Sequence, residues 1–241
     1  MLKYIYIALL LFLPLQTSKA KSITEGTKSG NFVHPGLSSV EQDTIHLNQV
    51  LYNGRKWIGI YYGVYGTEFM IDREWKTGDL TINGTTFRGI PIKYDIYNDQ
   101  LLTNYRNLRV LILNRELVES FTIYSGNEKH TFLNRDGTDG LSGYYEVFYE
   151  NNTALYKKWR KKRVQFAIDG MYDEFQSDNV LLLVKDGVVH ELKKRKTFMK
   201  VLSDRKDEVN DFARSSHIRP DLQMPESLIR ILEFYDNLNT L

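Results

Sequence analysis

The sequence of 241 residues contains no cysteine and only five prolines. Without cysteine, the chain can form no disulfide, carry no lipid on a thiol and use no thiolate as a nucleophile or metal ligand. Its charges nearly cancel, with 32 basic against 30 acidic side chains and a formal net charge of +2. No global field therefore draws the chain toward nucleic acid or anionic lipid.

Histidine is also scarce, and its five copies are dispersed. None of them shows the His-x-x-x-His or His-x-His spacing with which designed zinc sites bring two imidazoles to one ion. The sequence therefore predicts neither a metal site nor a cofactor. The histidines are His34, His46, His130, His190 and His217.

The N-terminus has the pattern of a secretory signal peptide. Lys3 precedes an apolar run over 4–15, and a short polar segment ends at Ala20, where small residues favour cleavage. The apolar run is too short to cross the hydrocarbon core, which takes roughly 20 residues. We expect export to the periplasm or the extracellular space, with no transmembrane segment in the mature chain.

Residues 21–50 are rich in Ser, Thr, Gly, Lys and Asn, which predicts a flexible arm. From 51 to 194, strand-like runs follow one another at short spacing, separated by turn signals such as Asn83-Gly84 and Asp186-Gly187. Strands joined this tightly must be antiparallel, because a parallel return needs a long crossover. We expect roughly ten strands in a meander that forms a strongly curved sheet or incomplete barrel. The runs are 56–64, 68–73, 78–83, 86–97, 108–114, 119–124, 130–133, 144–149, 164–168, 179–185 and 188–192.

The hydrophobic period changes after Leu192, and residues 195–241 are expected to form a helical tail packed on the sheet. Apolar residues at spacings of three and four predict two to three short helices. The second helix is expected to use Asp204 or Asp207 as its cap, and the third to begin after Pro225. The apolar positions are Phe198, Val201, Leu202, Val209, Phe212, Ala213, Leu228, Ile231, Leu232 and Tyr235.

Three stretches resemble a group of uncharacterised secreted proteins of Bacteroidota-type bacteria. They are the turn WKTGD at 75–79, the strand pair and helix start DNVLLLVKDGVVHELKKRKTFMKVL at 178–202, and the final helix PESLIRILEFYDNL at 225–238. The resemblance implies a secreted or envelope location and a β-rich fold. It implies no activity and brings no catalytic residues.

Five aromatic side chains are candidates for lining a ligand pocket. A small apolar ligand carried in a β-barrel-like interior would need such rings, although aromatic side chains on strands also serve as ordinary core. The lipocalin barrels begin with a Gly-x-Trp strand, but here one extra residue separates Gly54 from its tryptophan and would turn the ring to the other face. The five candidates are Trp57, Tyr61, Phe69, Trp75 and Tyr94.

The strongest local charge feature is the run KKWRKKR at 157–163, and a second basic cluster follows at 193–196. Cations interleaved with an aromatic ring are typical of binding to phosphate-bearing surfaces. Because the chain is expected to be exported, an anionic envelope surface is the favoured target and no nucleic-acid partner is expected. Lysines that deter strand pairing at a solvated sheet edge are the alternative. The run consists of Lys157, Lys158, Trp159, Arg160, Lys161, Lys162 and Arg163.

These patterns favour a non-enzymatic binding or envelope-associated module, whose partner is an envelope protein or an anionic envelope surface. A carrier of a small apolar ligand is one alternative. The other is a hydrolase acting on glycan or peptide, for which Glu68 and Glu74 are the nominal acids. The sequence carries no signal for an oligomeric state.

Overall fold

The computed structural model describes residues 49–59, 61–105, 109–165 and 173–238. The chain divides into two units, Met1–Gln42 and Asp43–Leu241, and every described residue belongs to the second unit. The signal peptide predicted over 1–20 and nearly all of the arm predicted over 21–50 lie outside the described residues.

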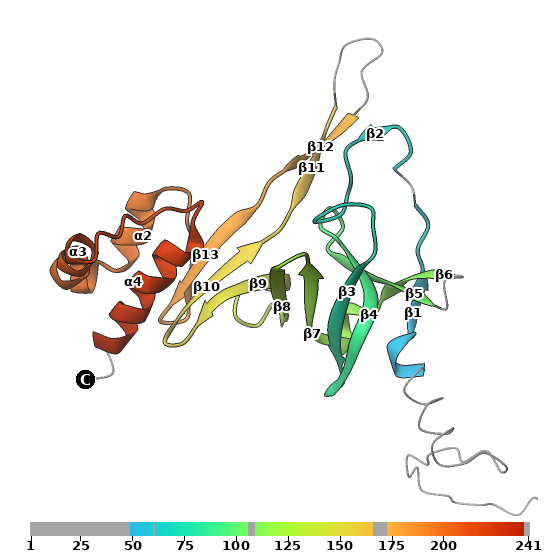
Figure 1. Cartoon of the computed structure of the whole chain (residues 1–241), viewed down its shortest axis with the longest axis horizontal. Coiled ribbons are helices and arrows are strands. Elements are labelled where there is room, and N and C mark those ends of the chain that lie inside the picture. Colours follow the sequence, from blue (N-terminus) through green and yellow to red (C-terminus); the bar gives the residue numbers. More distant parts are fainter. Residues whose placement is uncertain (1–48, 60, 106–108, 166–172, 239–241) are drawn as a thin grey trace, which may run out of the picture. The chain divides into compact units, whose positions relative to one another are not determined.

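One antiparallel sheet of eleven strands forms the body of the second unit (Figure 1). Its order is β1-β6-β5-β4-β3-β7-β8-β9-β10-β13-β14, so it runs open from β1 at one edge to β14 at the other. The mainly β fold, with an antiparallel meander in a curved, unclosed sheet, is therefore confirmed. The strands are β1 (Gly54–Lys56), β3 (Lys76–Ile82), β4 (Thr85–Asp95), β5 (Gln100–Tyr105), β6 (Arg109–Leu113), β7 (Val118–Ser125), β8 (Glu128–Asp136), β9 (Ser142–Glu150), β10 (Thr153–Lys158), β13 (Val180–Lys185) and β14 (Val188–Glu191).

A second, small sheet contains β2 (Val64–Tyr65), β11 (Lys161–Val164) and β12 (Asp173–Ser177) in the order β11-β12-β2. Its β12–β2 pair is parallel, which departs from the purely antiparallel pattern expected from the sequence. The parallel pair is possible because the whole of the large sheet from β3 to β10 separates the two strands along the chain.

The hairpin of β3 and β4 shows how local sequence sets the fold. Leu80 and Ile82 alternate with polar residues on β3, as Ile92 and Tyr94 do on β4, and all four are at most 2% exposed. Asn83 and Gly84 join the strands with φ angles of 47° and 72°. Positive φ at both residues is what a two-residue hairpin turn requires, and Asn-Gly adopts it at the lowest cost. The turn therefore fixes the register that places these four side chains on one face.

The apolar interior consists of separate clusters. The first lies under β3 to β9 and includes Phe121, Phe132 and Tyr144. The second joins Leu155 of β10 and Leu183 of β13 to the C-terminal helices. A third, smaller cluster contains Leu141, Tyr145, Ala154, Tyr156 and Leu182. Because side chains alternate along β10, Ala154 and Tyr156 belong to one cluster and Leu155 to another.

The C-terminal segment forms three α-helices, as predicted: α2 (Arg195–Val201), α3 (Lys206–Ser215) and α4 (Pro225–Leu238). A short 3-10 turn, η2 (Ser203–Arg205), lies between α2 and α3, and another, η1 (Arg115–Leu117), lies between β6 and β7. Helix α4 lies beside β9 and β10 (Figure 1). Its apolar side chains Leu228, Ile231 and Leu232 are fully buried in the second cluster. Within the described residues, none of the helices is both long enough and apolar enough to traverse a bilayer.

Several predicted strand boundaries are wrong. Among the described residues of the run 56–64, only the first and last belong to strands, and the run 68–73 contributes a single bridge between Phe69 and Asp95. The predicted strand 164–168 begins where β11 ends, and its last three residues lie outside the described part. Strands β5, β10 and β12 were not predicted at all. Two of them, β5 and β10, bury three and four consecutive residues, so their sequences lack the alternation that marks a half-exposed strand.

The predicted cap of the second helix is also wrong. Arg205 precedes α3, and no side chain caps the helix. Asp204 has another role: it accepts hydrogen bonds from Lys185 Nζ and from the Tyr235 hydroxyl, each at 2.6 Å. A carboxylate occupied by a lysine and a tyrosine joins β13 to α4 and is not available to the backbone of α3.

Candidate functional site

The five aromatic candidates do not form one pocket. Trp57, Tyr61 and Phe69 line a cavity of about 370 Å³, and the ring centroids of Trp57 and Phe69 lie 6.1 Å apart. Tyr94 is 1% exposed and packs in the first apolar cluster, where its ring contacts Phe121, Phe132 and Tyr144. Trp75 is not part of that cavity, and Lys93 Nζ lies 4.5 Å from its ring centroid. The structure thus gathers three of the five.

The two nominal acids are also separated. Glu68 is 5% exposed and lines the same cavity as Trp57, together with the cation of Lys93. Glu74 is exposed and does not line it. A glycosidase needs two carboxylates that flank one bond, whereas Glu68 is the single carboxylate among the described residues that line this cavity.

Most of the basic run 157–163 is occupied by contacts inside the chain. Lys158 Nζ donates to Asp99 Oδ2 at 2.7 Å, and Lys161 Nζ donates to the carbonyl oxygens of Thr67 and Phe69. The guanidinium groups pair with aspartates on β12 and beside it: Arg160 with Asp178, and Arg163 with Asp173. These cations are engaged by carboxylates and carbonyl oxygens of the chain itself, so they do not form an open patch.

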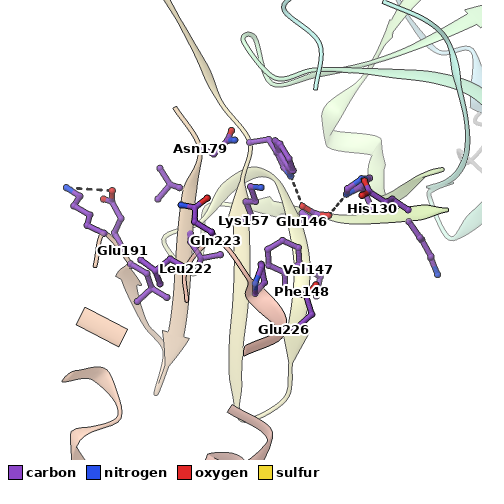
Figure 2. Close-up of a pocket in the computed structure, with 18 residues that line it drawn as sticks. His130, Glu146, Val147, Phe148, Lys157, Asn179, Glu191, Leu222, Gln223 and Glu226 are labelled. Atoms are coloured by element: carbon purple, nitrogen blue, oxygen red, sulfur yellow. Dashed lines mark hydrogen bonds and ion pairs between the residues drawn. The ribbon is translucent and has the colours of Figure 1, made fainter. Parts of the chain in front are cut away.

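A groove of about 750 Å³ crosses β8, β9, β10 and β13 on one face of the large sheet (Figure 2). It lies between the first and second apolar clusters, since Tyr144 of β9 belongs to the first and Phe148 packs against the second. The residues at the start of α4 and before it form another wall, as the labels of Leu222, Gln223 and Glu226 in Figure 2 show.

Three side chains in the floor of the groove bind one another. The carboxylate of Glu146 on β9 is 3% exposed, and both of its oxygens are hydrogen-bonded. His130 Nδ1 lies 2.6 Å from Oε1, and Trp159 Nε1 donates to Oε2 at 2.6 Å. Figure 2 shows both contacts as dashed lines meeting at Glu146. The contact between His130 and Glu146 follows from the register of β8 and β9. Phe132 of β8 lies directly opposite Glu146, and His130, two residues before Phe132, lies on the same face of β8.

The imidazole of His130 lies between two carboxylates. Its Nε2 is 3.3 Å from Glu128 Oε2, on the side opposite the contact with Glu146. The hydrogen bond to Glu146 raises the pKa of His130 above its ordinary value, and burial offsets part of this effect. Both ring nitrogens can then donate, one to each carboxylate, which fixes the ring in the groove.

Lys157 completes the floor. It lies directly opposite Glu146 in the pairing of β10 with β9, and its Nζ is 3.5 Å from the centroid of the Trp159 ring. Burial lowers the pKa of Lys157, against the attraction of Glu146. The cation therefore covers one face of the indole ring, a favourable cation–π contact.

Charges of both signs line the groove. Four glutamates and three lysines contribute, together with the amides of Asn179 and Gln223 and the apolar side chains of Phe148 and Leu181. Glu191 and Lys193 lie 3.6 Å apart at the rim and are joined by a dashed line in Figure 2. The glutamates are Glu128, Glu146, Glu191 and Glu226, and the lysines are Lys129, Lys157 and Lys193. Such a lining suits a ligand that carries both charges and hydrogen-bonding groups.

Sequence reasoning did not find His130 or Glu146 as site residues, because they lie 16 positions apart on different strands. One signal could have pointed to Glu146. Glu146 lies on the same face of β9 as Tyr144 and Phe148, which pack in apolar clusters. A carboxylate at such a position needs a hydrogen-bonding or charged partner. Within the residues that the structure describes, no group of three or more histidine and acidic side chains could hold a metal ion.

No family model, curated protein or solved structure matches this chain.

Proposed function

We propose that this chain is an exported, envelope-associated binding module that holds a short peptide segment in the groove and carries out no reaction on it. The observation that supports this is the mutual pairing of His130, Glu146 and Trp159. A general base needs an unoccupied lone pair within reach of the substrate. Here the imidazole faces a carboxylate at each nitrogen, and the buried carboxylate accepts two hydrogen bonds.

The proposed ligand class follows from the lining of the groove. A volume of about 750 Å³ is within the range of sites that enclose small ligands, and both signs of charge are present. A peptide carries amines, carboxylates and backbone amides together, and thus can pair with Lys193, Glu226 and Gln223 at the rim. A purely apolar compound would leave these groups without partners, at a cost in affinity.

The export half of the proposal is supported by Lys3 and the apolar run over 4–15. Its test is fractionation of cells that express the full chain with a C-terminal tag, beside a chain lacking residues 2–20. We expect a shortened, tagged product outside the cytoplasm for the full chain only. An uncleaved product confined to the cytoplasm would refute export.

The binding half can be tested with the fluorescence of Trp159. Trp57→Phe and Trp75→Phe remove the other two tryptophans and leave one reporter in the groove. We expect a pool of short peptides of mixed charge to change this emission saturably, and neutral oligosaccharides to leave it unchanged. Lys193→Glu combined with Glu226→Lys should weaken the change, whereas Lys56→Glu, on the exposed strand β1, should not.

The same incubation separates binding from catalysis. Mass spectrometry should recover the peptides intact. Cleavage products that disappear in the His130→Ala or Glu146→Ala variant would overturn the proposal in favour of a hydrolase.

A carrier of a small apolar ligand is the second candidate, and one observation favours it. Three rings, Trp57, Tyr61 and Phe69, line the cavity of about 370 Å³. Its walls also contain Glu68, Arg73 and Lys93, which favours an apolar ligand with one polar group. Saturable binding of an environment-sensitive apolar dye that is lost in Trp57→Ala and kept in Trp75→Ala would establish this site.

A further inference from the structure

The second basic cluster, unlike the first, gathers around an open hollow. Lys193, Lys194 and Arg195 lead into α2, and Arg219 and Arg230 reach the same hollow from the segment before α4 and from α4 itself. The hollow has a volume of about 800 Å³, and His217 adds a titratable ring to its lining. We call these five cations and the hollow between them the basic hollow.

Four of the five cations have no partner in the described part of the chain. Lys194, Arg195, Arg219 and Arg230 are exposed, and within the described residues none of their side chains makes a hydrogen bond or lies within 4.0 Å of a carboxylate. Lys193 has one weak partner, Glu191, at 3.6 Å. This contrasts with the run 157–163, in which Lys158, Arg160 and Arg163 all form ion pairs. Cationic side chains that form no ion pair within the described part of the chain are available to bind an external anion.

The acids of the hollow do not cancel its charge. Asp221 and Glu226 are the acidic lining residues, against five permanent cations. Asp221 Oδ1 already accepts a hydrogen bond from the backbone of Gln223. The lining therefore keeps a net positive charge of 3 when His217 is neutral.

An exposed apolar side chain distinguishes between anionic partners. Met224 lines the basic hollow and is 59% exposed, with Ile218 and Leu222 beside it in the lining. A soluble polyanion would gain no apolar contact from an exposed thioether surrounded by cations. A lipid surface does, because cations meet the headgroups while an apolar side chain enters the boundary with the acyl chains.

We propose that the basic hollow docks this protein onto an anionic phospholipid surface, with Lys194, Arg219 and Arg230 at the headgroup phosphates and Met224 inserted between them. This goes beyond the peptide-binding function and does not depend on it. The two sites share Lys193, Leu222, Gln223 and Glu226 at their common wall, so the test uses residues of the basic hollow that do not line the groove.

The test is cosedimentation of the full chain with vesicles. Vesicles of phosphatidylglycerol and phosphatidylcholine should bind the protein, and vesicles of phosphatidylcholine alone should not. Lys194→Glu with Arg219→Glu should weaken the apparent affinity by about tenfold or more, as should raising the salt to about 0.5 M. The matched control is Arg88→Glu with Lys56→Glu, which makes the same change in net charge at two exposed cations outside the hollow and outside the run 157–163.

Met224→Ser separates a lipid surface from a soluble polyanion. We expect it to reduce vesicle binding severalfold while leaving the retention of the protein on immobilised polyphosphate unchanged. Equal binding to both kinds of vesicle, an equal loss in the control pair, or no effect of Met224→Ser would overturn the proposal. Thermal melts that match the parent chain will show that the variants are folded.

Discussion

Lys158 Nζ lies 2.7 Å from Asp99 Oδ2 and joins the end of β10 to the turn between β4 and β5, 59 residues earlier in the chain. The hydroxyl of Tyr94 donates to the other oxygen of Asp99 at 2.5 Å, and Lys158 also donates to the carbonyl oxygen of Tyr144 at 3.0 Å. Burial lowers the pKa of Lys158, and Asp99 opposes that shift. Because burial alone disfavours the charged ammonium of Lys158, the charge of Lys158 at this position depends on the carboxylate of Asp99.

Removing either partner should destabilise the fold. Asp99→Asn leaves the half-buried ammonium without its anion, and Lys158→Met leaves the carboxylate with only Tyr94 and a distant Arg115. We expect each variant to lose roughly 2 to 3 kcal/mol of unfolding free energy in urea denaturation. The double variant should lose less than the sum, with a coupling of roughly 1 to 2 kcal/mol. Strict additivity would show that the contact contributes no stability.

Gly143 is required by the same pair. Its φ is +94°, and an added Cβ would overlap Asp99 Oδ2 and lie 2.6 Å from Lys158 Nζ. We expect Gly143→Ala to cost roughly 3 kcal/mol or more in chemical denaturation. Gly126→Ala is the matched control, because its φ is +60° and nothing lies within 4 Å of the added Cβ, so only the backbone cost of about 1 kcal/mol applies. Equal losses in the two variants would contradict a steric role for the ion pair.

His130 should make stability depend on pH. Its folded-state pKa is raised above the ordinary value by Glu146, so its contribution is fully present below the unfolded-state pKa and is lost as pH rises through the folded-state pKa. As the pH rises above the ordinary imidazole pKa of about 6.5 and through the raised folded-state pKa, the parent chain should therefore lose stability that His130→Gln does not lose. Denaturation curves at a series of pH values measure this. Parallel pH profiles for the two proteins would mean that the imidazole carries no linked proton.

Asp236 of α4 should be one of the main attachments of the helices to the sheet. It is 1% exposed and accepts hydrogen bonds from the hydroxyls of Tyr149 and Thr153 and from the backbone N–H of Thr153. Asp236→Ala leaves these donors buried and unpaired, and we expect a loss of roughly 2 to 4 kcal/mol with earlier melting of the helical signal. Asp211→Ala, an exposed acid on α3, is the control and should melt like the parent.

The elements that could be predicted are those whose local pattern is complete. Leu80 and Ile82 alternate with polar residues in a half-exposed strand, and the turn residues Asn83-Gly84 follow them. The hydrophobic period and the turn signal therefore indicate the same hairpin. Strand β10 fails this criterion because Leu155 faces one apolar cluster while Ala154 and Tyr156 face another. Burial on both faces removes the alternation from the sequence, and only the packed structure shows the strand.

The sites depend on register and tertiary packing, which no local pattern carries. The position of His130 beside Glu146 follows from the pairing of β8 with β9, and a shift of β8 by one residue would place the two side chains on opposite faces of the sheet. The basic run was visible in the sequence, but the partners that occupy it, such as Asp99 and Asp178, come from distant segments. The cluster at 193–196 was visible too, whereas Arg219 and Arg230 join it only through the placement of α4.

Strand β9 passes from the first apolar cluster at Tyr144 to the second at Phe148, and the charged side chain of Glu146 lies between them. The hydrogen bonds of Glu146 to His130 and Trp159 lie between these two clusters, and the smaller third cluster packs on the same strands through Tyr145, Tyr156 and Leu182. We therefore expect the C-terminal helices with β10 and β13 to lose their protection against amide hydrogen exchange while the β3 to β8 region retains its own. The molecule would then unfold in two stages, with the groove as the boundary between the two parts.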